Sequence, residues 1–379
     1  MIYLDHAAAT PVCRKALEAM EPYYKAEFFN PSSPYLPAKK VAADYEAAKD
    51  EIAHAIGAKG SDLVITAGAT EANNLAFTSA ENGILYLETE HDSVRQVAAS
   101  LGGVAIRVLP SGVIDLADLR KKITDETELI SVSLANNELG TIQPLAEIAA
   151  IIREVKLDRM RRGVKRQLLL HSDASQALNL VDISVARLGV DLLTLNSAKV
   201  YGPKGVGALY VSHEARLKPL VAGGGQERGL RSGTENVSGV IGFAAAAREA
   251  KKHLKNNRLE YRELRQILLD DLQGYELINK KHVLDNFIVL CYNRLDAERL
   301  IFLLEERGVY VATGAACAAS KGVRSHVLKA IGLSDAEIAG SLRLSLGELN
   351  DAAQIREAAK IINEVVAEER ARVSQNSSA

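Results

Sequence analysis

Two hydrophobic patterns alternate along most of the chain. From about residue 38 to residue 272, stretches with apolar residues at every third or fourth position, the first covering residues 38–58, are separated by short and wholly apolar runs. The length and the β-branched residues of these runs indicate buried strands at residues 63–66, 84–87, 129–134, 168–170, 192–195 and 208–211. The alternation predicts an α/β fold with a mostly parallel sheet that helices cover on both faces.

The pattern changes toward the C-terminus. Residues 236–272 form a long, charge-rich helical stretch, after which shorter elements follow: strands at 287–292 and 309–313, and helices at 297–307 and 351–370. Ser334-Asp335-Ala336-Glu337 has the form of a capping box and predicts another helix start. Residues 374–379 are predicted to be a disordered tail. We expect an N-terminal segment (1–15) packed on the small domain, a large domain (16–258) and a small α+β domain (259–379).

Composition and charge exclude several classes of protein. The chain has 379 residues, which favours one large and one smaller domain, and its formal charge of 46 − 48 = −2 does not indicate a nucleic-acid surface. Two basic stretches, 159–166 and 251–258, are typical of solvated faces. No apolar segment is long enough to cross a bilayer, and the first residues lack a basic head followed by an apolar stretch. We therefore expect a cytoplasmic protein that binds neither nucleic acid nor membrane.

The three cysteines, Cys13, Cys291 and Cys317, lie far apart, and the eight histidines lack the spacing of metal ligands. Neither a disulfide framework nor a metal site is predicted. Cys291 follows an apolar run and fits a small buried residue. Cys317 lies among the small residues of segment 313–320, which no packed core requires. That composition predicts a mobile loop that could carry a reactive thiolate.

Polar residues follow five of the predicted strands at the points where these strands end. They are the segments 68–71 and 136–138, the residues His91 and Asp173, and the segment 196–199. The carboxyl ends of parallel strands meet at one edge of a sheet, where ligands bind in folds of this class. Packing alone does not explain this concentration of polar groups, so the edge is the predicted functional site.

Lys199 would be partly desolvated at this edge, which makes an amine nucleophilic toward an aldehyde. A lysine near a strand end is more often a surface residue, so Lys199 alone does not indicate a cofactor. Asp173, one strand earlier, supplies a carboxylate that can keep a pyridinium nitrogen protonated, although it could also serve only as a helix N-cap. Gln176 can donate to a phenolic oxygen of the same ring.

The segment Gly68-Ala69-Thr70-Glu71-Ala72-Asn73-Asn74 is a turn of small residues that leads from a strand into a helix. Backbone amides at a helix start, together with the Thr70 hydroxyl, can bind a phosphate group. Many strand-to-helix turns have this composition. Combined with Lys199 and Asp173, the turn predicts the phosphate site of one cofactor.

These motifs, in this order, resemble those of the class V aminotransferase family and, within it, the cysteine desulfurases. The resemblance extends from segment 3–11 to segment 341–347. It is carried by Asn30-Pro31-Ser32-Ser33, the Thr70 turn, Thr89-Glu90-His91, Asn136-Asn137-Glu138-Leu139-Gly140, Asp173-Ala174-Ser175-Gln176, Gly223-Gly224-Gly225-Gln226-Glu227-Arg228-Gly229, Arg231-Ser232-Gly233-Thr234 and Thr313-Gly314-Ala315-Ala316-Cys317. It implies the aminotransferase-like fold type I, with a seven-stranded sheet flanked by helices, and pyridoxal 5'-phosphate (PLP) as the cofactor.

The resemblance also implies roles for individual residues. Lys199 would hold the cofactor covalently, and His91 would stack on its ring and move protons, unless His91 only caps a helix. Thr234 would reach the phosphate bound by a neighbouring subunit, which implies a homodimer. The cofactor-binding residues implied are Ala69, Thr70, His91, Asn137, Asp173, Gln176, Asn196, Ser197, Lys199 and Thr234. The substrate would be bound by Asn30, Asn137 and Arg343, with Arg343 on its carboxylate.

The activity that the resemblance implies is conversion of L-cysteine to L-alanine, with a persulfide left on Cys317. The sulfur would pass to an acceptor protein such as an iron–sulfur scaffold or a tRNA-thiolation protein, and the sequence around Cys317 resembles the iron–sulfur branch. Three alternatives stay open: a selenocysteine lyase, another class V enzyme such as a transaminase, and a weakened homologue that acts by binding a partner. Cys317 argues against the transaminase.

One motif departs from the family pattern. Where the family usually has Ser-x-His-Lys, this chain has Asn196-Ser197-Ala198-Lys199. Ala198 cannot make the phosphate contact of that histidine, although Asn196 or Ser197 could supply a neutral donor. We expect weaker cofactor retention than in typical relatives.

Overall fold

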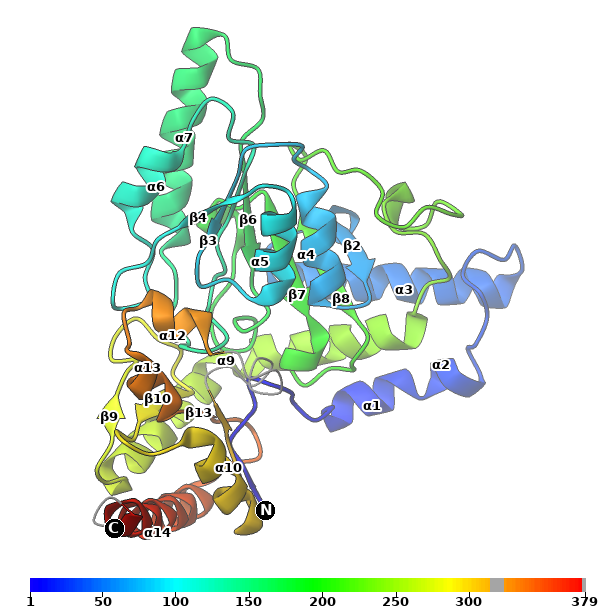
Figure 1. Cartoon of the computed structure of the whole chain (residues 1–379). Coiled ribbons are helices and arrows are strands. Elements are labelled where there is room, and N and C mark those ends of the chain that lie inside the picture. The colour runs from blue at the N-terminus through cyan, green and yellow to red at the C-terminus, as the bar shows by residue number, and fades with distance from the viewer. Residues whose placement is uncertain (314–323, 377–379) are drawn as a thin grey trace.

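The computed structural model describes residues 1–313 and 324–376 (Figure 1). Its largest sheet has seven strands in the order β2-β8-β7-β6-β5-β3-β4. Neighbouring strands are parallel except around β8, which is antiparallel to β2 and to β7. The strands are β2 (Leu63–Thr66), β3 (Ile84–Leu87), β4 (Val104–Ile106), β5 (Leu129–Ser131), β6 (Leu169–Asp173), β7 (Leu192–Asn196) and β8 (Gly207–Val211). The predicted mostly parallel, seven-stranded α/β sheet is confirmed.

Helices cover both faces of this sheet, which explains why the strands are apolar throughout. Successive residues of a strand enter different cores: Val64 packs with α4 and α5, whereas its neighbours Leu63 and Ile65 pack in the core formed with α3, α7 and α9. The helices of this part are α1 (Arg14–Met20), α2 (Pro22–Lys25), α3 (Leu36–Ala55), α4 (Ala69–Phe77), α5 (Asp92–Ser100), α6 (Leu116–Lys122), α7 (Leu145–Arg162), α8 (Val185–Leu188) and α9 (Val237–Asp271).

The predicted strand boundaries match those of β2 and β3 and lie within one residue of those of β7 and β8. The run 129–134 is shorter as a strand, since β5 ends at Ser131, although the amides of Val132 and Leu134 still donate to carbonyls of β6. β4 was not identified among the apolar runs. It has three residues at the edge of the sheet, and Val104 is 50% exposed, so it lacks the signature of a buried strand.

The C-terminal lobe, which we define as residues 272–313 and 324–376, contains an antiparallel sheet in the order β12-β13-β10-β9. Its elements are β9 (Glu276–Leu277), β10 (Phe287–Cys291), α10 (Ala297–Glu306), β11 (Val309–Tyr310), β12 (Ala312–Thr313), α12 (His326–Ala330), α13 (Asp335–Ala339), β13 (Ser341–Ser345) and α14 (Ala352–Asn376). The predicted capping box at Ser334 is confirmed. The predicted tail is wrong for residues 374–376, which continue α14, and residues 377–379 lie outside the described part.

The N-terminal segment lies against this lobe. β1 (Ile2–Tyr3) pairs in parallel with β11, and Asp5 forms a bridge with Ser345 of β13. The helix α9 runs without a break across residue 258, and it packs on α1 and α3 as well as on α14. The domain boundaries at residues 15 and 258 stay predictions. None of the described helices is both long enough and apolar enough to cross a membrane.

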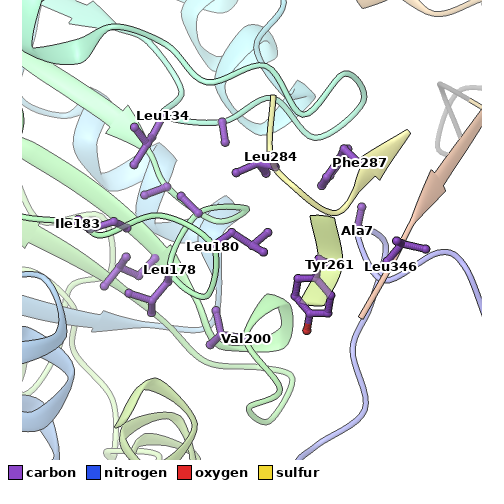
Figure 2. Close-up of a cluster of buried hydrophobic side chains, with 14 of the residues drawn as sticks. Ala7, Leu134, Leu178, Leu180, Ile183, Val200, Tyr261, Leu284, Phe287 and Leu346 are labelled. Atoms are coloured by element: carbon purple, nitrogen blue, oxygen red, sulfur yellow. The ribbon is translucent and has the colours of Figure 1, made fainter. Parts of the chain in front are cut away.

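One apolar cluster joins the N-terminal segment, the large sheet and the C-terminal lobe (Figure 2). Ala7 lies beside Leu346 in the close-up, and Phe287 and the ring of Tyr261 from α9 lie next to them. Leu178, Leu180 and Val200 extend the same core toward the sheet. The segment around Ala7 is therefore held in a fixed place at the carboxyl edge of the sheet.

A buried ion pair fixes the glycine-rich segment 223–229. The Glu227 carboxylate accepts hydrogen bonds from the Tyr45 hydroxyl at 2.6 Å, from the Lys49 amine at 3.1 Å and from the Ile65 amide at 2.8 Å. The Lys49 and Glu227 side chains are only 7% and 5% exposed. Glu227 also has a φ of 48°, an unfavourable value for a residue with a side chain. These contacts stabilise that backbone conformation.

We predict that Glu227→Ala lowers the free energy of unfolding by about 3–5 kcal/mol, because it leaves the Lys49 charge buried without its partner. Urea denaturation measures this change. Glu46 is the matched control, since it contacts the same lysine at 4.0 Å but is 64% exposed, and Glu46→Ala should change stability by less than about 1 kcal/mol. Equal effects of the two variants would contradict the prediction.

Candidate active site

Asp173 is the last residue of β6 and is 7% exposed. One carboxylate oxygen accepts a hydrogen bond from the Asn73 side-chain amide at 2.8 Å, and the other accepts one from the Ser175 backbone amide at 2.8 Å. Both donors are neutral, so they orient the carboxylate without cancelling its charge. Two neighbouring groups respond to this environment. Burial and the negative charge of Asp173 raise the pKa of Glu90 well above its usual range, and burial lowers the pKa of His171 to about 4.

Lys199 and Gln176 meet at the backbone carbonyl of Ala7. The Lys199 amine donates to this oxygen at 2.8 Å and also to the Ala8 carbonyl, while the Gln176 amide donates to the Ala7 oxygen at 3.0 Å. Gln176 follows Asp173 by three residues in the turn after β6, so the structure brings all three predicted side chains to one edge of the sheet. The sequence did not reveal that the N-terminal segment would complete this group.

A short helical turn, η2 (Ser197–Lys199), presents the lysine at the end of β7. The Asn196 side chain begins this turn by accepting a hydrogen bond from the Ala198 amide at 3.2 Å. Thr10 holds its far side, because the Thr10 hydroxyl donates to the Ala198 carbonyl at 3.1 Å and accepts from the Tyr201 amide at 2.9 Å. Thr10 belongs to a motif quoted for the resemblance, but its contact with the lysine turn depends on the tertiary fold.

His91 is the N-cap of α5, so the capping alternative is part of its role. Its Nδ1 accepts a hydrogen bond from the Ser93 amide at 3.1 Å and lies 2.8 Å from the Ser93 hydroxyl. That hydroxyl in turn accepts a hydrogen bond from the Asn73 amide at 2.8 Å. A continuous set of hydrogen bonds therefore joins His91 to Asp173. Neither Asn73 nor Ser93 was a predicted site residue, although Asn73 lies within the segment 68–74 and Ser93 lies two residues after His91.

The turn before α4 has the geometry that a phosphate group requires. Gly68 has a φ of 150°, and a Cβ built there would meet nothing within 4 Å. Gly207 is paired with both Thr66 and Asn196, so the turn and the start of η2 lie at neighbouring strand ends. Ala69 is half-buried and Thr70 is exposed. The Ser197 hydroxyl is buried, and no described residue hydrogen-bonds with it. The open turn at Gly68 fits a phosphate site.

Arg343, in β13, is 4% exposed, and its guanidinium is already bound within the chain. It donates to the Asp5 carboxylate at 2.6 Å and to the backbone carbonyl of Asn137 at 2.8 Å. The structure thus brings Asn137 and Arg343 together, but through the main chain of Asn137. Asp5 was not among the predicted site residues, and 338 positions separate it from Arg343.

Three predicted residues are not joined to this group. Asn30 is exposed in the loop between α2 and α3, where its side chain accepts from the Ser32 amide at 2.9 Å, and that loop lies on the opposite side of Figure 1 from β13. Thr234 is exposed, and no hydrogen bond within the described residues joins it to the lysine turn. Cys317 lies outside the described residues.

Comparison with known proteins identifies the family. The family model described as "Aminotransferase class-V" matches residues 2–357. The chain belongs to this family. Among curated class-V relatives, "Cysteine desulfurase IscS" of Methanosarcina thermophila is 36% identical over 384 residues, covering 96% of this chain and 92% of that protein. "Cysteine desulfurase IscS 1" of Archaeoglobus fulgidus is 37% identical over 366 residues, covering 92% of this chain and 93% of the relative.

Solved structures of similar proteins have the same fold. A "NifS-like protein" matches with a TM-score of 0.89 and 30% identity, covering 97% of this chain and 99% of its own. The structure described as "SspA in complex with cysteine" matches with a TM-score of 0.79 and 32% identity, covering 91% of this chain and 99% of its own. The match therefore includes both the large sheet and the C-terminal lobe.

We predict that Asp5→Asn lowers the free energy of unfolding by about 1–3 kcal/mol, because the Arg343 charge is then buried without a counter-charge. Urea denaturation measures the effect. Asp92 is a matched control, since its ion pair with Arg95 is largely exposed, with the two side chains 54% and 34% accessible. Asp92→Asn should have little effect. If Asp5→Asn were as stable as the wild type, the ion pair with Asp5 would not be what stabilises the buried charge of Arg343.

Glu138 gives the site a measurable pH response. Burial raises the pKa of Glu138 from 4.5 to about 7, and its carboxylate accepts a hydrogen bond from the Ser325 hydroxyl at 2.5 Å. Ser325 is the N-cap of α12. The folded protein therefore holds a proton on Glu138 more tightly than the unfolded chain does. The resulting stability is complete below the unfolded pKa near 4.5 and is lost as the pH rises through about 7.

Replacing Glu138 by Gln should remove this dependence while keeping an acceptor for Ser325. Between about pH 4.5 and pH 8, the stability of the wild type should fall by about 3 kcal/mol relative to Glu138→Gln. Urea denaturation over this range measures the difference. Glu154→Gln is a surface control with 61% side-chain exposure, and its curve should run parallel to the wild type in this window. A parallel curve for Glu138→Gln would refute the assignment.

Proposed function

We propose that this class-V aminotransferase is a PLP-dependent cysteine desulfurase that moves sulfur from L-cysteine onto Cys317. The observation that carries the proposal is the convergence of Lys199, Gln176 and Asp173 at one sheet edge, beside the open turn at Gly68. An amine, a phenol-binding amide, a carboxylate and a phosphate site are the groups that PLP requires from a protein. The names of the curated relatives support the choice of reaction.

Each group has a defined task in this proposal. Lys199 would hold the cofactor, Asp173 would keep a proton on its ring nitrogen, and Gln176 would donate to its phenolic oxygen. Thr70 and Ser197, with the amides at the start of α4, would bind its phosphate. The bound cofactor supplies an electron sink for charge that develops on the substrate. These residues fit the cofactor because each offers the required donor or acceptor at the same edge.

The remaining residues act on the substrate. Arg343 would bind the carboxylate of L-cysteine, since a guanidinium recognises a carboxylate with two parallel hydrogen bonds. The N–H groups of the Arg343 guanidinium would then donate both to the substrate carboxylate and to Asp5. Lys199, once released, would take the proton from the substrate α-carbon, and His91 would return protons during the later steps.

The sulfur step conserves atoms and electrons. The Cys317 thiolate attacks the substrate sulfur and forms an S–S bond, and the C–S bond of the substrate breaks. The β-carbon keeps the electron pair of that bond and takes up a proton, which gives L-alanine. The enzyme retains a persulfide. We propose a cytoplasmic acceptor protein for this sulfur, such as an iron–sulfur scaffold or a tRNA-thiolation protein.

We also propose a homodimer. Large apolar side chains are exposed along α1, α2 and the start of α3, including Tyr24 at 63%, Phe28 at 67% and Leu36 at 80%. A continuous exposed apolar surface is typical of an interface. A second subunit would cover it and would bring its own Thr234 to the phosphate.

The proposed function predicts an added sulfur atom on Cys317 after the PLP-loaded enzyme is incubated with L-cysteine. Mass spectrometry of the digested protein locates the added sulfur, and amino-acid analysis measures L-alanine. Cys317→Ser should lose the added sulfur and lower alanine release by more than about 100-fold. Cys13→Ser is the matched control and should retain both. Full activity of Cys317→Ser would refute the proposal. A wild-type enzyme that gains no sulfur and releases no L-alanine would favour a partner-binding homologue.

A further inference from the structure

The proposed function assigns no task to Asn73, although it is fully buried in α4. Its side-chain nitrogen donates one hydrogen bond to the Asp173 carboxylate and one to the Ser93 hydroxyl, both at 2.8 Å. A carboxylate only accepts hydrogen bonds, so the NH₂ group must face it, and the reversed amide would place two oxygens in contact. The Asn73 carbonyl oxygen is buried and has no partner among the described residues. The contact with Asp173 therefore fixes the amide orientation.

The backbone amide of Ser93, which makes Nδ1 of His91 an acceptor, and the Asn73 amide together determine where the Ser93 hydrogen goes. The Ser93 hydroxyl oxygen accepts from Asn73, which leaves its own hydrogen to be donated. Nδ1 of His91 lies 2.8 Å away, and the backbone amide of Ser93 donates to the same nitrogen at 3.1 Å. A ring nitrogen that accepts hydrogen bonds cannot itself carry a hydrogen. In the neutral ring the proton is then on Nε2.

We infer that Asn73 and Ser93 are positioning residues that transmit the orientation of Asp173 to His91 and hold its neutral ring with the proton on Nε2. The inference rests on the proposed function for the task it gives His91. In the proposed reaction, the proton would already be on Nε2 of His91 when the substrate arrives. His91 would then act on the substrate as a proton donor. Ser93 also holds the ring plane, because its hydroxyl and its backbone amide both bind Nδ1.

A purely structural role is the competing explanation, in which the two side chains only tie α4 to α5. The two explanations differ in what they predict for the imidazole. If the Ser93 hydroxyl only packs, its loss leaves the hydrogen bonding of Nδ1 unchanged, whereas in the hydrogen-bond chain its loss removes one of the two donors to Nδ1. The tautomer can be measured without any turnover.

The test is ¹⁵N NMR of the full-length protein with labelled histidine, recorded without and with PLP at a pH where the ring is neutral. His91→Gln identifies the resonances. In the wild type we expect a protonated Nε2 and an unprotonated Nδ1. Ser93→Ala removes the hydroxyl donor but keeps the backbone amide, so Nδ1 should stay unprotonated while its resonance moves toward the position of a nitrogen that accepts fewer hydrogen bonds. Ser93→Thr keeps the hydroxyl and should restore the wild-type spectrum.

Kinetics of the loaded enzyme provide a second readout. Ser93→Ala should lower kcat by about 10-fold with the KM for L-cysteine unchanged, because proton transfer is affected and Arg343 is not. Ser93→Thr should restore kcat. Asn73→Leu, which cannot donate to either neighbour, should also move the Nδ1 resonance from its wild-type position; if Asn73→Leu does not fold, Ser93→Ala decides alone.

Two results would overturn the inference: a wild-type ring with its proton on Nδ1, or a Ser93→Ala spectrum identical to the wild type. Failure of the proposed function is separately visible, because wild-type enzyme would then release no alanine whatever the tautomer of His91. A normal alanine yield with the wrong tautomer would remove only the role of Asn73 and Ser93.

Discussion

The site depends on one carboxylate, Asp173, placed at the end of a buried strand and held by neutral donors. Burying a charge costs free energy unless hydrogen bonds and an opposite charge stabilise it. The Asn73 amide and the Ser175 main chain provide the hydrogen bonds and leave the negative charge available for the ring nitrogen of the proposed cofactor. Through Asn73, the same carboxylate is joined to Ser93 and, through Ser93, to His91.

Much of this geometry could be predicted, because it follows from strand order. Once the apolar runs are recognised as parallel strands, their carboxyl ends must converge, which is why Asp173 and Lys199 were identified correctly as neighbours of one edge. β4 escaped detection because an edge strand with exposed residues has no wholly apolar run. The contacts of Asp5 and Asn73 could not be predicted, since they join segments whose proximity only the tertiary fold determines.

The N-terminal segment has more influence on the site than its length suggests. The carbonyl of Ala7 receives the hydrogen bonds of both Lys199 and Gln176, and Asp5, two residues earlier, binds Arg343. The cluster in Figure 2 fixes the Ala7 side chain between the sheet and the C-terminal lobe. The short segment from Asp5 to Ala7 therefore contacts both the proposed cofactor-binding residues, Lys199 and Gln176, and the proposed substrate-binding residue, Arg343.

The unbroken course of α9 constrains how this molecule can be divided. The first half of α9 packs with α1 and α3, and its last turns reach α14 in the C-terminal lobe. One helix therefore buries apolar surface of both parts of the chain. A protein cut inside this helix would expose both faces of the shared core. We expect that the two lobes, if expressed as separate fragments, would aggregate rather than fold.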